Sequence, residues 1–171
     1  MLSAINALIA APETTAPDYN RDLFGGDWID ADGDGCDTRC EVLEAERVEI
    51  PVGQTGWVSL YDNYSTDDES ELDIDHMVPL AEAWRSGAST WEPSQRIAYA
   101  NDLDAPTSLI AVTAATNRSK SDKDPAQWQP PSDDAWCAYV DAWVTTKTRW
   151  ALTADTAELA ALRNMATARS C

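Results

Sequence analysis

The stretch "LDIDHMVPL", residues 72–80, carries the strongest structural signal in this sequence. Apolar and polar residues alternate in it, so Leu72, Ile74 and His76 would lie on one face of a β-strand. Pro79 ends the alternation, and His76 is the only histidine of the chain. An acidic run, "TDDESELD", leads into the strand. We therefore predict a strand that delivers one imidazole into strongly acidic surroundings.

Further elements are predicted on both sides of this strand. A second apolar strand, "TSLIAVTAA" (107–115), precedes the polar "NRSKSDKDPAQW" (117–128), which opens a helix or turn. The stretches "VEIPV" (48–52) and "WVSLYD" (57–62) flank "GQTG" and predict a β-hairpin. Helices are expected in "LSAINALIAAP" with Ile5, Leu8 and Ile9 on one face, in "TRCEVLEAERV" with a Thr38–Glu41 capping box, and at 79–88, 92–102, 133–149 and 154–168.

Length and composition suit one α+β domain spanning residues 1–171. The chain has 44% apolar residues, and it lacks the run of about 18 apolar residues that a membrane span needs. Its net charge of −18 is most simply a solvated surface, while the functional interpretation is cation binding by clustered carboxylates. Such a charge argues against a nucleic acid partner, because proteins that bind nucleic acids usually present a basic surface.

The cysteines at positions 36, 40, 137 and 171 indicate either two disulfides or one metal site. An even number, with one cysteine at the last residue, is typical of disulfides in an exported protein. Cys36–Cys40 and Cys137–Cys171 are the pairs that we expect. The alternative is a zinc site made of all four thiolates, although "CDTRC" does not show the Cys-x2-Cys spacing common in such sites.

Asp75, His76 and Asn117 form the first candidate site. A carboxylate can hold a hard divalent cation, an imidazole can take a proton from water near pH 7, and an amide oxygen can complete the protein ligands. Such a set suits phosphodiester hydrolysis, in which the base makes the nucleophile and the metal neutralises charge on the phosphate. The alternative is a strand histidine with an ordinary structural role and an asparagine that caps a helix.

Arg118, Lys120 and Lys123 place three of the twelve basic residues of the chain close to Asn117. Their charged groups can pair with phosphate oxygens and give a local positive field in an acidic protein. Taken alone, the three would be interpreted as a solvated surface. Beside a proposed metal site, we interpret them as phosphate-binding residues.

A second candidate is "DADGDGCDTRCE", residues 30–41, which matches the calcium-loop pattern of EF-hands. It would offer Asp30, Asp32, Asp34 and Glu41 as ligands to Ca²⁺. The context does not fit, because "FGGDW" breaks the helix that an EF-hand needs before its loop. The alternative is a tight Gly/Asp loop that leads into a helix.

Several of these stretches together resemble the HNH, or ββα-metal, endonuclease signature. "DIDHMVPL" and the later "NRSKSDKDP" are similar to paired segments of HNH domains, including those of RNA-guided CRISPR effectors. Nearly the whole chain resembles small actinobacterial HNH family endonucleases, which are related to the C-terminal domain of GmrSD-type restriction enzymes. The shared stretches include "YNRDLFGGDW", "GCDTRCEVL", "LIAVTAATNRSKSDKDPAQWQPP" and "CAYVDAW". The resemblance implies a ββα-metal core at residues 70–125.

The resemblance also assigns roles to individual residues. It makes His76 the general base, and Asp75 and Asn117 the ligands of one Mg²⁺ or Mn²⁺ ion. Asn101 would match the middle asparagine of HNH, which braces the loop that carries the base, and the alternative is a surface helix cap. Arg39 would bind phosphate or pair with another part of the chain. Asn117 stands in for the last histidine of many HNH motifs.

The sequence departs from the family pattern at one cysteine. Relatives often carry a cysteine near the position of Trp57, paired with the one in "GCDTR". Here that cysteine is missing and Cys40 is extra. A local Cys36–Cys40 bridge would compensate for the difference.

The resemblance implies a secreted, monomeric, metal-dependent endonuclease with little sequence specificity. It would cleave DNA, with RNA as a further candidate substrate, and leave 5′-phosphate products. The charge of −18 adds an expectation of salt tolerance, because repulsion from DNA is strong at low salt and screened at high salt. Two alternatives stay open: a non-enzymatic exported calcium-binding module centred on residues 30–41, and a toxin or restriction domain from a longer chain.

Overall fold

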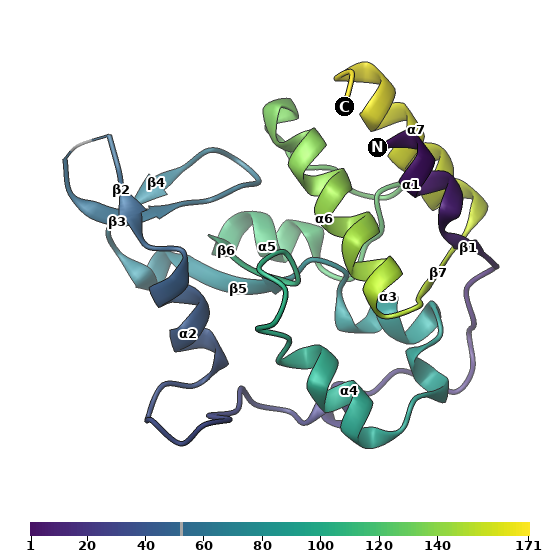
Figure 1. The fold of residues 1–171 in the computed structure, drawn as a ribbon, viewed down its shortest axis with the longest axis horizontal. Coiled ribbons are helices and arrows are strands. Elements are labelled where there is room, and N and C mark those ends of the chain that lie inside the picture. The colour runs from purple at the N-terminus through teal and green to yellow at the C-terminus, as the bar shows by residue number, and fades with distance from the viewer. Residues whose placement is uncertain (52) are drawn as a thin grey trace.

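The computed structural model describes residues 1–51 and 53–171, and the fold is α+β as predicted (Figure 1). The helices are α1 (Leu2–Ala7), α2 (Thr38–Ala45), α3 (Leu80–Arg85), α4 (Pro93–Ala100), α5 (Ala114–Lys120), α6 (Trp136–Arg149) and α7 (Thr156–Ala168). The strands are β1 (Ile9–Ala10), β2 (Val48–Glu49), β3 (Thr55–Val58), β4 (Ser65–Thr66), β5 (Leu72–His76), β6 (Leu109–Thr113) and β7 (Thr153–Ala154). Within the described ranges, no helix has the length and apolar character needed to cross a membrane.

Strands β5 and β6 pair antiparallel, from Leu72 opposite Thr113 to His76 opposite Leu109. Both strands lie where the sequence predicted them, although α3 and α4 separate them along the chain (Figure 1). Helix α5 follows β6 directly, and the Thr113 side chain caps its first turn by accepting from the Thr116 N–H. The order strand, strand, helix therefore agrees with the prediction, and the lone histidine ends the first strand.

The β5–β6 pair is buried on both faces. Leu72 and Ile74 pack with α2 and Trp57 in a small apolar cluster. Ile110 and Val112 belong instead to the main core, to which α3, α6 and α7 contribute. Because neighbouring residues of a strand point to opposite faces, the two clusters fix the register of the pair and so the direction of each polar side chain in it.

Several tryptophans contribute to the core. Trp84 and Trp143 are buried, and Trp91 and Trp128 pack against the main cluster. Several of these rings meet edge to face with tyrosines, an arrangement that aromatic quadrupoles favour. They are therefore structural residues and are not base-stacking platforms.

The predicted β-hairpin is present with shorter strands. Strands β2 and β3 pair antiparallel, with Val48 opposite Gly56, and β4 adds a third strand that the sequence did not indicate. A Cβ at Gly56 would clash with the Thr66 carbonyl oxygen, so β4 can approach only because this residue is glycine. Val52, which the predicted first strand includes, lies outside the described residues.

Two local predictions were wrong. Asp37 caps α2 by accepting from the Cys40 N–H at 2.9 Å, so the Thr38–Glu41 capping box does not form. The Thr38 hydroxyl bonds to groups outside the helix instead. Ile9 does not share the buried face of α1, because the chain extends there to pair with β7 and leaves Ile9 56% exposed.

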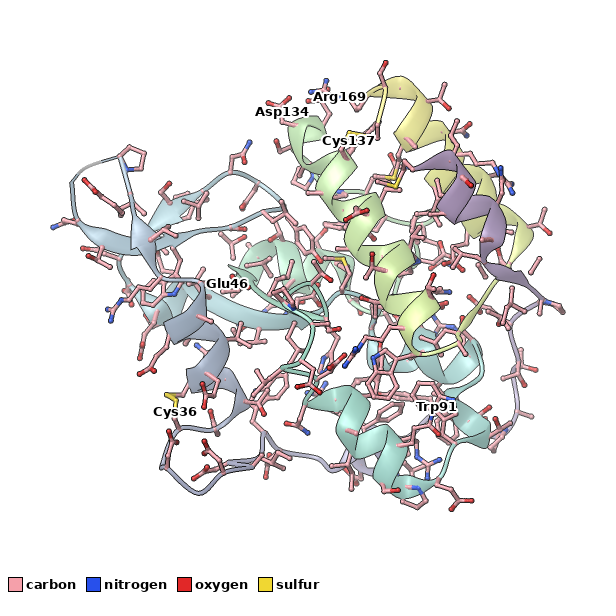
Figure 2. All side chains as sticks on the ribbon, in the orientation of Figure 1. Cys36, Glu46, Trp91, Asp134, Cys137 and Arg169 are labelled. Carbon is pink, nitrogen blue, oxygen red and sulfur yellow. A yellow bond between two sulfur atoms is a disulfide. The ribbon has the colours of Figure 1, made fainter. Side chains whose placement is uncertain are left out.

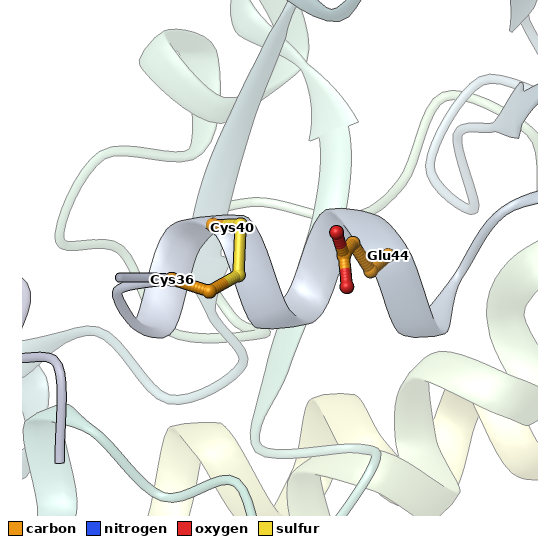
Figure 3. Close-up of side chains that lie close together, drawn as sticks. All are labelled: Cys36, Cys40 and Glu44. Carbon is orange, nitrogen blue, oxygen red and sulfur yellow. A yellow bond between two sulfur atoms is a disulfide. The ribbon is translucent and has the colours of Figure 1, made fainter. Parts of the chain in front are cut away.

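Both predicted disulfides are present. Cys36–Cys40 closes the start of α2, and Cys137–Cys171 ties α6 to the last residue of the chain (Figure 2). All four cysteines are used, so the alternative of a four-thiolate zinc site is wrong. Glu44 lies beside the first disulfide in Figure 3, but metals bind thiolates, and the two bonded sulfurs are not available to one.

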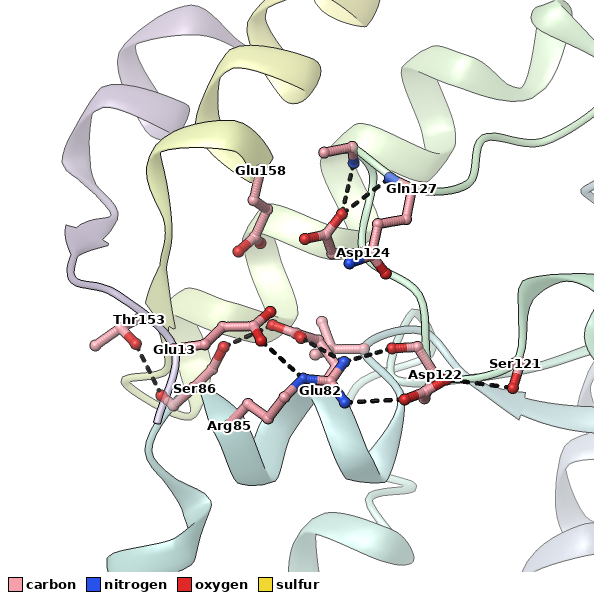
Figure 4. A network of polar contacts seen from close by, with 12 residues as sticks. Glu13, Glu82, Arg85, Ser86, Ser121, Asp122, Asp124, Gln127, Thr153 and Glu158 are labelled. Atoms are coloured by element: carbon pink, nitrogen blue, oxygen red, sulfur yellow. Dashed lines mark hydrogen bonds and ion pairs between the residues drawn. The ribbon is translucent and has the colours of Figure 1, made fainter. Parts of the chain in front are cut away.

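A buried ion network joins α3, α6 and α7. The Lys147 ammonium has no exposure and donates to Glu82 at 2.9 Å, to Glu158 at 2.7 Å and to the Thr153 carbonyl at 2.7 Å. Arg85 connects this network to two more exposed acids, because it also pairs with Glu13 and Asp122 (Figure 4). Buried charges are tolerated only when they are paired and hydrogen-bonded, and Lys147 meets both conditions.

Candidate active site

A cavity of about 550 Å³ lies beside the end of β5. Three parts of the chain line it: a segment from Tyr19 to Arg39, strand β5 with the turn after it, and the end of α5 with the turn that follows. The lining residues are Tyr19, Arg21, Trp28, Arg39, Asp73, Ile74, Asp75, His76, Pro79, Leu80, Ala81, Asn117, Arg118, Ser121 and Asp122. The cavity therefore collects the predicted base, both predicted metal ligands and two of the predicted phosphate-binding residues.

His76 is 8% exposed, and its Nε2 lies 2.9 Å from the Ala100 carbonyl oxygen. A carbonyl can only accept, so Nε2 carries the hydrogen and Nδ1 is left with a lone pair. Burial lowers the pKa of His76 to about 4, which keeps the ring neutral near pH 7. The single histidine is thus held as a neutral imidazole with one nitrogen available as a base.

Two aromatic rings flank this imidazole. The Trp28 ring stacks on His76 with centroids 5.3 Å apart and planes 18° apart, and the Tyr99 ring does so at 6.2 Å and 18°. Both rings therefore lie nearly parallel to the imidazole, and Trp28 is the nearer of the two. The Tyr99 hydroxyl donates to the Val78 carbonyl, which holds that ring in place.

Asp75 is buried, and one of its carboxylate oxygens is fully engaged. Oδ2 accepts from the Tyr61 hydroxyl at 2.5 Å and from the Lys120 ammonium at 2.6 Å. Oδ1 accepts no hydrogen bond from the described residues, although Asp75 lines the cavity. Burial raises the pKa of Asp75, and the contact with Lys120 opposes that rise. One oxygen is therefore fixed by the protein and the other is left for a cation or water.

Lys120 does not lie on the cavity surface, where the predicted phosphate-binding role would place it. Its side chain has no exposure, and its ammonium donates to Asp75 and, at 2.9 Å, to the His76 carbonyl. It compensates a carboxylate that would otherwise be buried without a partner, and so its charge is not offered to a phosphate. Lys123 also lies outside the cavity lining and donates to the Ser119 carbonyl at 2.8 Å.

Asp73 and Asn117 meet on the cavity wall. The Asn117 amide nitrogen donates to Asp73 Oδ2 at 3.2 Å, and the Arg118 Nε lies 3.8 Å from the same oxygen. The hydrogen bond uses the NH2 group of Asn117, so its amide oxygen is the atom that could bind a cation. Arg118 keeps 77% of its side chain exposed, as a residue that meets a large ligand would.

Asn101 lies outside the cavity but touches a segment that lines it. Its Oδ1 accepts from the Thr38 hydroxyl at 2.8 Å and from the Ile29 N–H at 3.2 Å. Arg39 reaches the cavity wall, and its guanidinium donates to the Glu69 and Leu72 carbonyls. Of the two roles that the sequence left open for Arg39, the structure shows the contact with another part of the chain.

Three residues of the site were missed from sequence. Arg21 and Trp28 line the cavity, and Tyr61 holds Asp75. The first two lie in "YNRDLFGGDW", a stretch noted only for its resemblance, and Tyr61 lies at the end of the predicted hairpin. No periodicity marks them, because their roles depend on contacts with strand β5 much later in the chain.

The predicted calcium loop brings part of its ligand set together. Asp30, Asp32 and Asp34 can place one carboxylate oxygen each within 4.8 Å of the others, but Glu41 does not join them. Four of their oxygens already accept backbone N–H groups of the loop. Only a short 3-10 turn, Arg21–Phe24, precedes the loop, where an EF-hand needs a helix. A calcium ion here stays a prediction.

Comparison with known proteins places this site in a family. Residues 46–165 match the family described as GmrSD restriction endonucleases, C-terminal domain. The chain belongs to this family. The predicted relation to GmrSD enzymes is thus confirmed, and the matched range contains Asp75, His76 and Asn117. The segment that supplies Arg21 and Trp28 lies before it.

The chain is also similar to a fungal protein. An uncharacterized secreted protein of Arthroderma benhamiae is 38% identical over 169 residues, which cover 95% of this chain and 81% of that protein. No solved structure matches the chain. The similarity to the fungal protein extends over nearly the whole chain, and so includes residues before the range matched by the GmrSD C-terminal family.

Proposed function

We propose that this protein is a metal-dependent endonuclease that hydrolyses phosphodiester bonds of DNA, and of RNA where it enters the cavity, with little sequence specificity. The observation that carries the proposal is His76: a neutral imidazole, fixed through Nε2, with Nδ1 left as a base in a cavity that also holds carboxylates, an amide and arginines. Membership of the GmrSD C-terminal family supports the same reaction class.

His76 supplies the general base in this proposal. Nδ1 takes a proton from a water molecule, whose oxygen then forms a bond to phosphorus while the bond from phosphorus to the 3′ oxygen breaks. The leaving 3′ oxygen takes a proton from solvent water, and the imidazolium later returns its proton to solvent. The products are a 5′-phosphate and a 3′-hydroxyl. The Ala100 carbonyl stabilises the imidazolium that forms, because Nε2–H donates to it throughout. A base placed in this way is typically worth about 10²- to 10⁴-fold in rate.

The donor atoms of the cavity fit Mg²⁺ or Mn²⁺. Asp75 Oδ1 and the Asn117 amide oxygen are hard oxygen donors, and Asp73 adds a carboxylate next to Asn117. When bound, such an ion would neutralise negative charge on the phosphate and on the leaving oxygen. Lys120 and Tyr61 hold the other oxygen of Asp75 and so orient the carboxylate toward the cavity.

Arginines answer the objection that the protein is too acidic to bind nucleic acid. Arg21 and Arg118 line the cavity, and both belong to the exposed part of the molecule. Two cavity acids are already neutralised, since Lys120 pairs with Asp75 and Arg85 pairs with Asp122 at 2.9 Å. The local field at the cavity is therefore less negative than the total charge suggests, and we assign phosphate binding to the two arginines.

The first test is cleavage of supercoiled plasmid with Mg²⁺ or Mn²⁺, each with and without EDTA. We expect nicked and linear DNA with either metal and intact plasmid with the chelator, because oxygen ligands alone leave the substrate charge uncompensated. Intact plasmid with both metals, together with a rise in Tm caused by Ca²⁺ alone, would support instead the calcium-binding module centred on residues 30–41.

Salt should increase cleavage over the lower part of its range. At constant Mg²⁺, we expect the rate to rise between about 10 mM and 150 mM NaCl, as the Debye length falls from about 30 Å to about 8 Å and screens the −18 charge from DNA. Thermal melting in the same buffers separates this effect from a change in stability. A rate that declines steadily from the lowest salt would contradict the proposed association mechanism.

We propose that the protein works outside the cell as a monomer. The fungal relative is described as secreted, and both disulfides of this chain belong to an oxidising compartment.

A further inference from the structure

We infer that the segment 19–39, which precedes the range matched by the family, sets the orientation of His76, and that Trp28 is the positioning residue through which it acts. The inference rests on the proposed function, because a fixed imidazole matters only if His76 is the base. It concerns a part of the chain that precedes the family match and contributes no ligand to the proposed Mg²⁺ or Mn²⁺ site.

Three contacts of the imidazole, with Ala100, Trp28 and Tyr99, support a positioning role for Trp28. The Ala100 carbonyl fixes one edge of the ring through Nε2. A single hydrogen bond still allows the ring to rotate about the line that joins donor and acceptor. Trp28 and Tyr99 both stack on the ring with planes only 18° from that of the imidazole, and so they oppose its rotation. The remaining edge, with Nδ1, is the part of the ring left to the cavity.

Trp28 is itself held by the turn that holds Ala100. Ile29, the next residue, donates its N–H to Asn101 Oδ1 at 3.2 Å, and its carbonyl accepts from the Thr38 N–H at 2.9 Å. The Thr38 hydroxyl bridges the Ile29 carbonyl and Asn101, at 3.1 and 2.8 Å. Asn101 adjoins Ala100 in the chain. One turn at the end of α4 therefore fixes both the hydrogen-bond acceptor and the stacking partner of His76.

A purely structural role for Trp28 predicts different behaviour. The indole is only partly buried against the small apolar cluster, and one part of it lines the cavity. If packing alone mattered, Trp28→Leu, which keeps an apolar side chain, should behave like Trp28→Phe. If stacking on His76 matters, only the phenylalanine variant should preserve the ring orientation and the rate.

The test uses the sole histidine as a reporter that needs no substrate. Long-range ¹H–¹⁵N spectra of the full chain should show one tautomer, with hydrogen on Nε2, in wild type and in Trp28→Phe. Trp28→Leu and Trp28→Ala should show a mixture, and diethyl pyrocarbonate should modify His76 faster in both. Their kcat on plasmid should fall about tenfold with little change in KM, since one stacked pair is lost and the binding residues remain.

Two further variants make the result decisive. Trp136→Ala removes another partly buried indole, whose N–H donates to the Pro130 carbonyl and which does not line the cavity, and it should change neither spectrum nor rate. Asn101→Ala should reproduce the loss seen in Trp28→Ala. A single unchanged tautomer and unchanged reactivity in folded Trp28→Ala would overturn the inference even if wild type cleaves DNA. Absence of cleavage by wild type would overturn the proposed function. The spectra of the variants would then still show whether Trp28 orients the His76 ring.

Discussion

His76→Ala should cleave plasmid about 10²- to 10⁴-fold more slowly than wild type while staying folded. The substitution removes the only imidazole, and among the described residues no other histidine could take its place. It also leaves the Ala100 carbonyl without the Nε2–H donor, but His76 lines the cavity, and we expect water to fill the space that the imidazole leaves. The measurement is single-turnover cleavage at fixed Mg²⁺, with circular dichroism and thermal melting on the same samples.

Chemical rescue distinguishes a lost base from a damaged site. The cavity of about 550 Å³ is large enough to admit a free imidazole molecule, so added imidazole should restore part of the activity of His76→Ala. Ser94→Ala, a substitution on the exposed side of α4, serves as the control and should cleave at the wild-type rate. Cleavage within about threefold of wild type by folded His76→Ala would rule out the assignment of His76 as a base, whose loss costs far more.

Lys147→Met should destabilise the protein by about 3–5 kcal/mol, because it leaves Glu82 and Glu158 buried without their shared cation. For a chain of this length, that loss lowers Tm by roughly 10 °C. Burial already raises the pKa of Glu158 to about 7 against the opposing effect of Lys147. Without Lys147 the pKa of Glu158 in the folded state rises further, so the folded state binds more protons than the unfolded state. The free energy of unfolding of Lys147→Met should therefore fall as pH rises, and the destabilisation relative to wild type should be smaller at pH 5 than at pH 8.

Neutralising the acids tests whether charge is the cause. The triple variant Lys147→Met, Glu82→Gln, Glu158→Gln carries no unpaired charge at this point and should recover most of the lost stability. Lys123→Met, which removes a lysine outside the network, should shift the free energy of unfolding by less than about 0.5 kcal/mol. Equal destabilisation by both lysine substitutions, or a loss independent of pH, would contradict the role given to the network.

Short-range pattern predicted the part of the fold that presents His76. Alternation in residues 72–76 marked β5, and an apolar run that includes residues 109–113 marked β6, a strand that buries side chains in two apolar clusters. The polar segment after the second strand indicated α5. The pairing of Asp75–His76 with Asn117 in one cavity follows from this order, and here the sequence was sufficient.

Other parts of the site could not be predicted, because they depend on partners distant in the chain. Lys120 looked like a surface cation, since a charged residue in a polar segment gives no sign that Tyr61 and Asp75 surround it. Trp28 was not singled out, because nothing local shows that its ring meets His76. Both the burial of Lys120 and the stacking of Trp28 depend on tertiary contacts, and such contacts produce no periodic pattern in the sequence.

The burial of two lysines also decides how the protein can be modified chemically. Lys120, Lys123 and Lys147 are the lysines of this sequence, and the ammonium groups of Lys120 and Lys147 are both enclosed and bonded to carboxylates. A reagent that attacks neutral side-chain amines would therefore reach Lys123 first while the protein is folded. Attachment of a dye or a solid support through side-chain amines should thus be nearly site-specific, at a point outside the cavity lining.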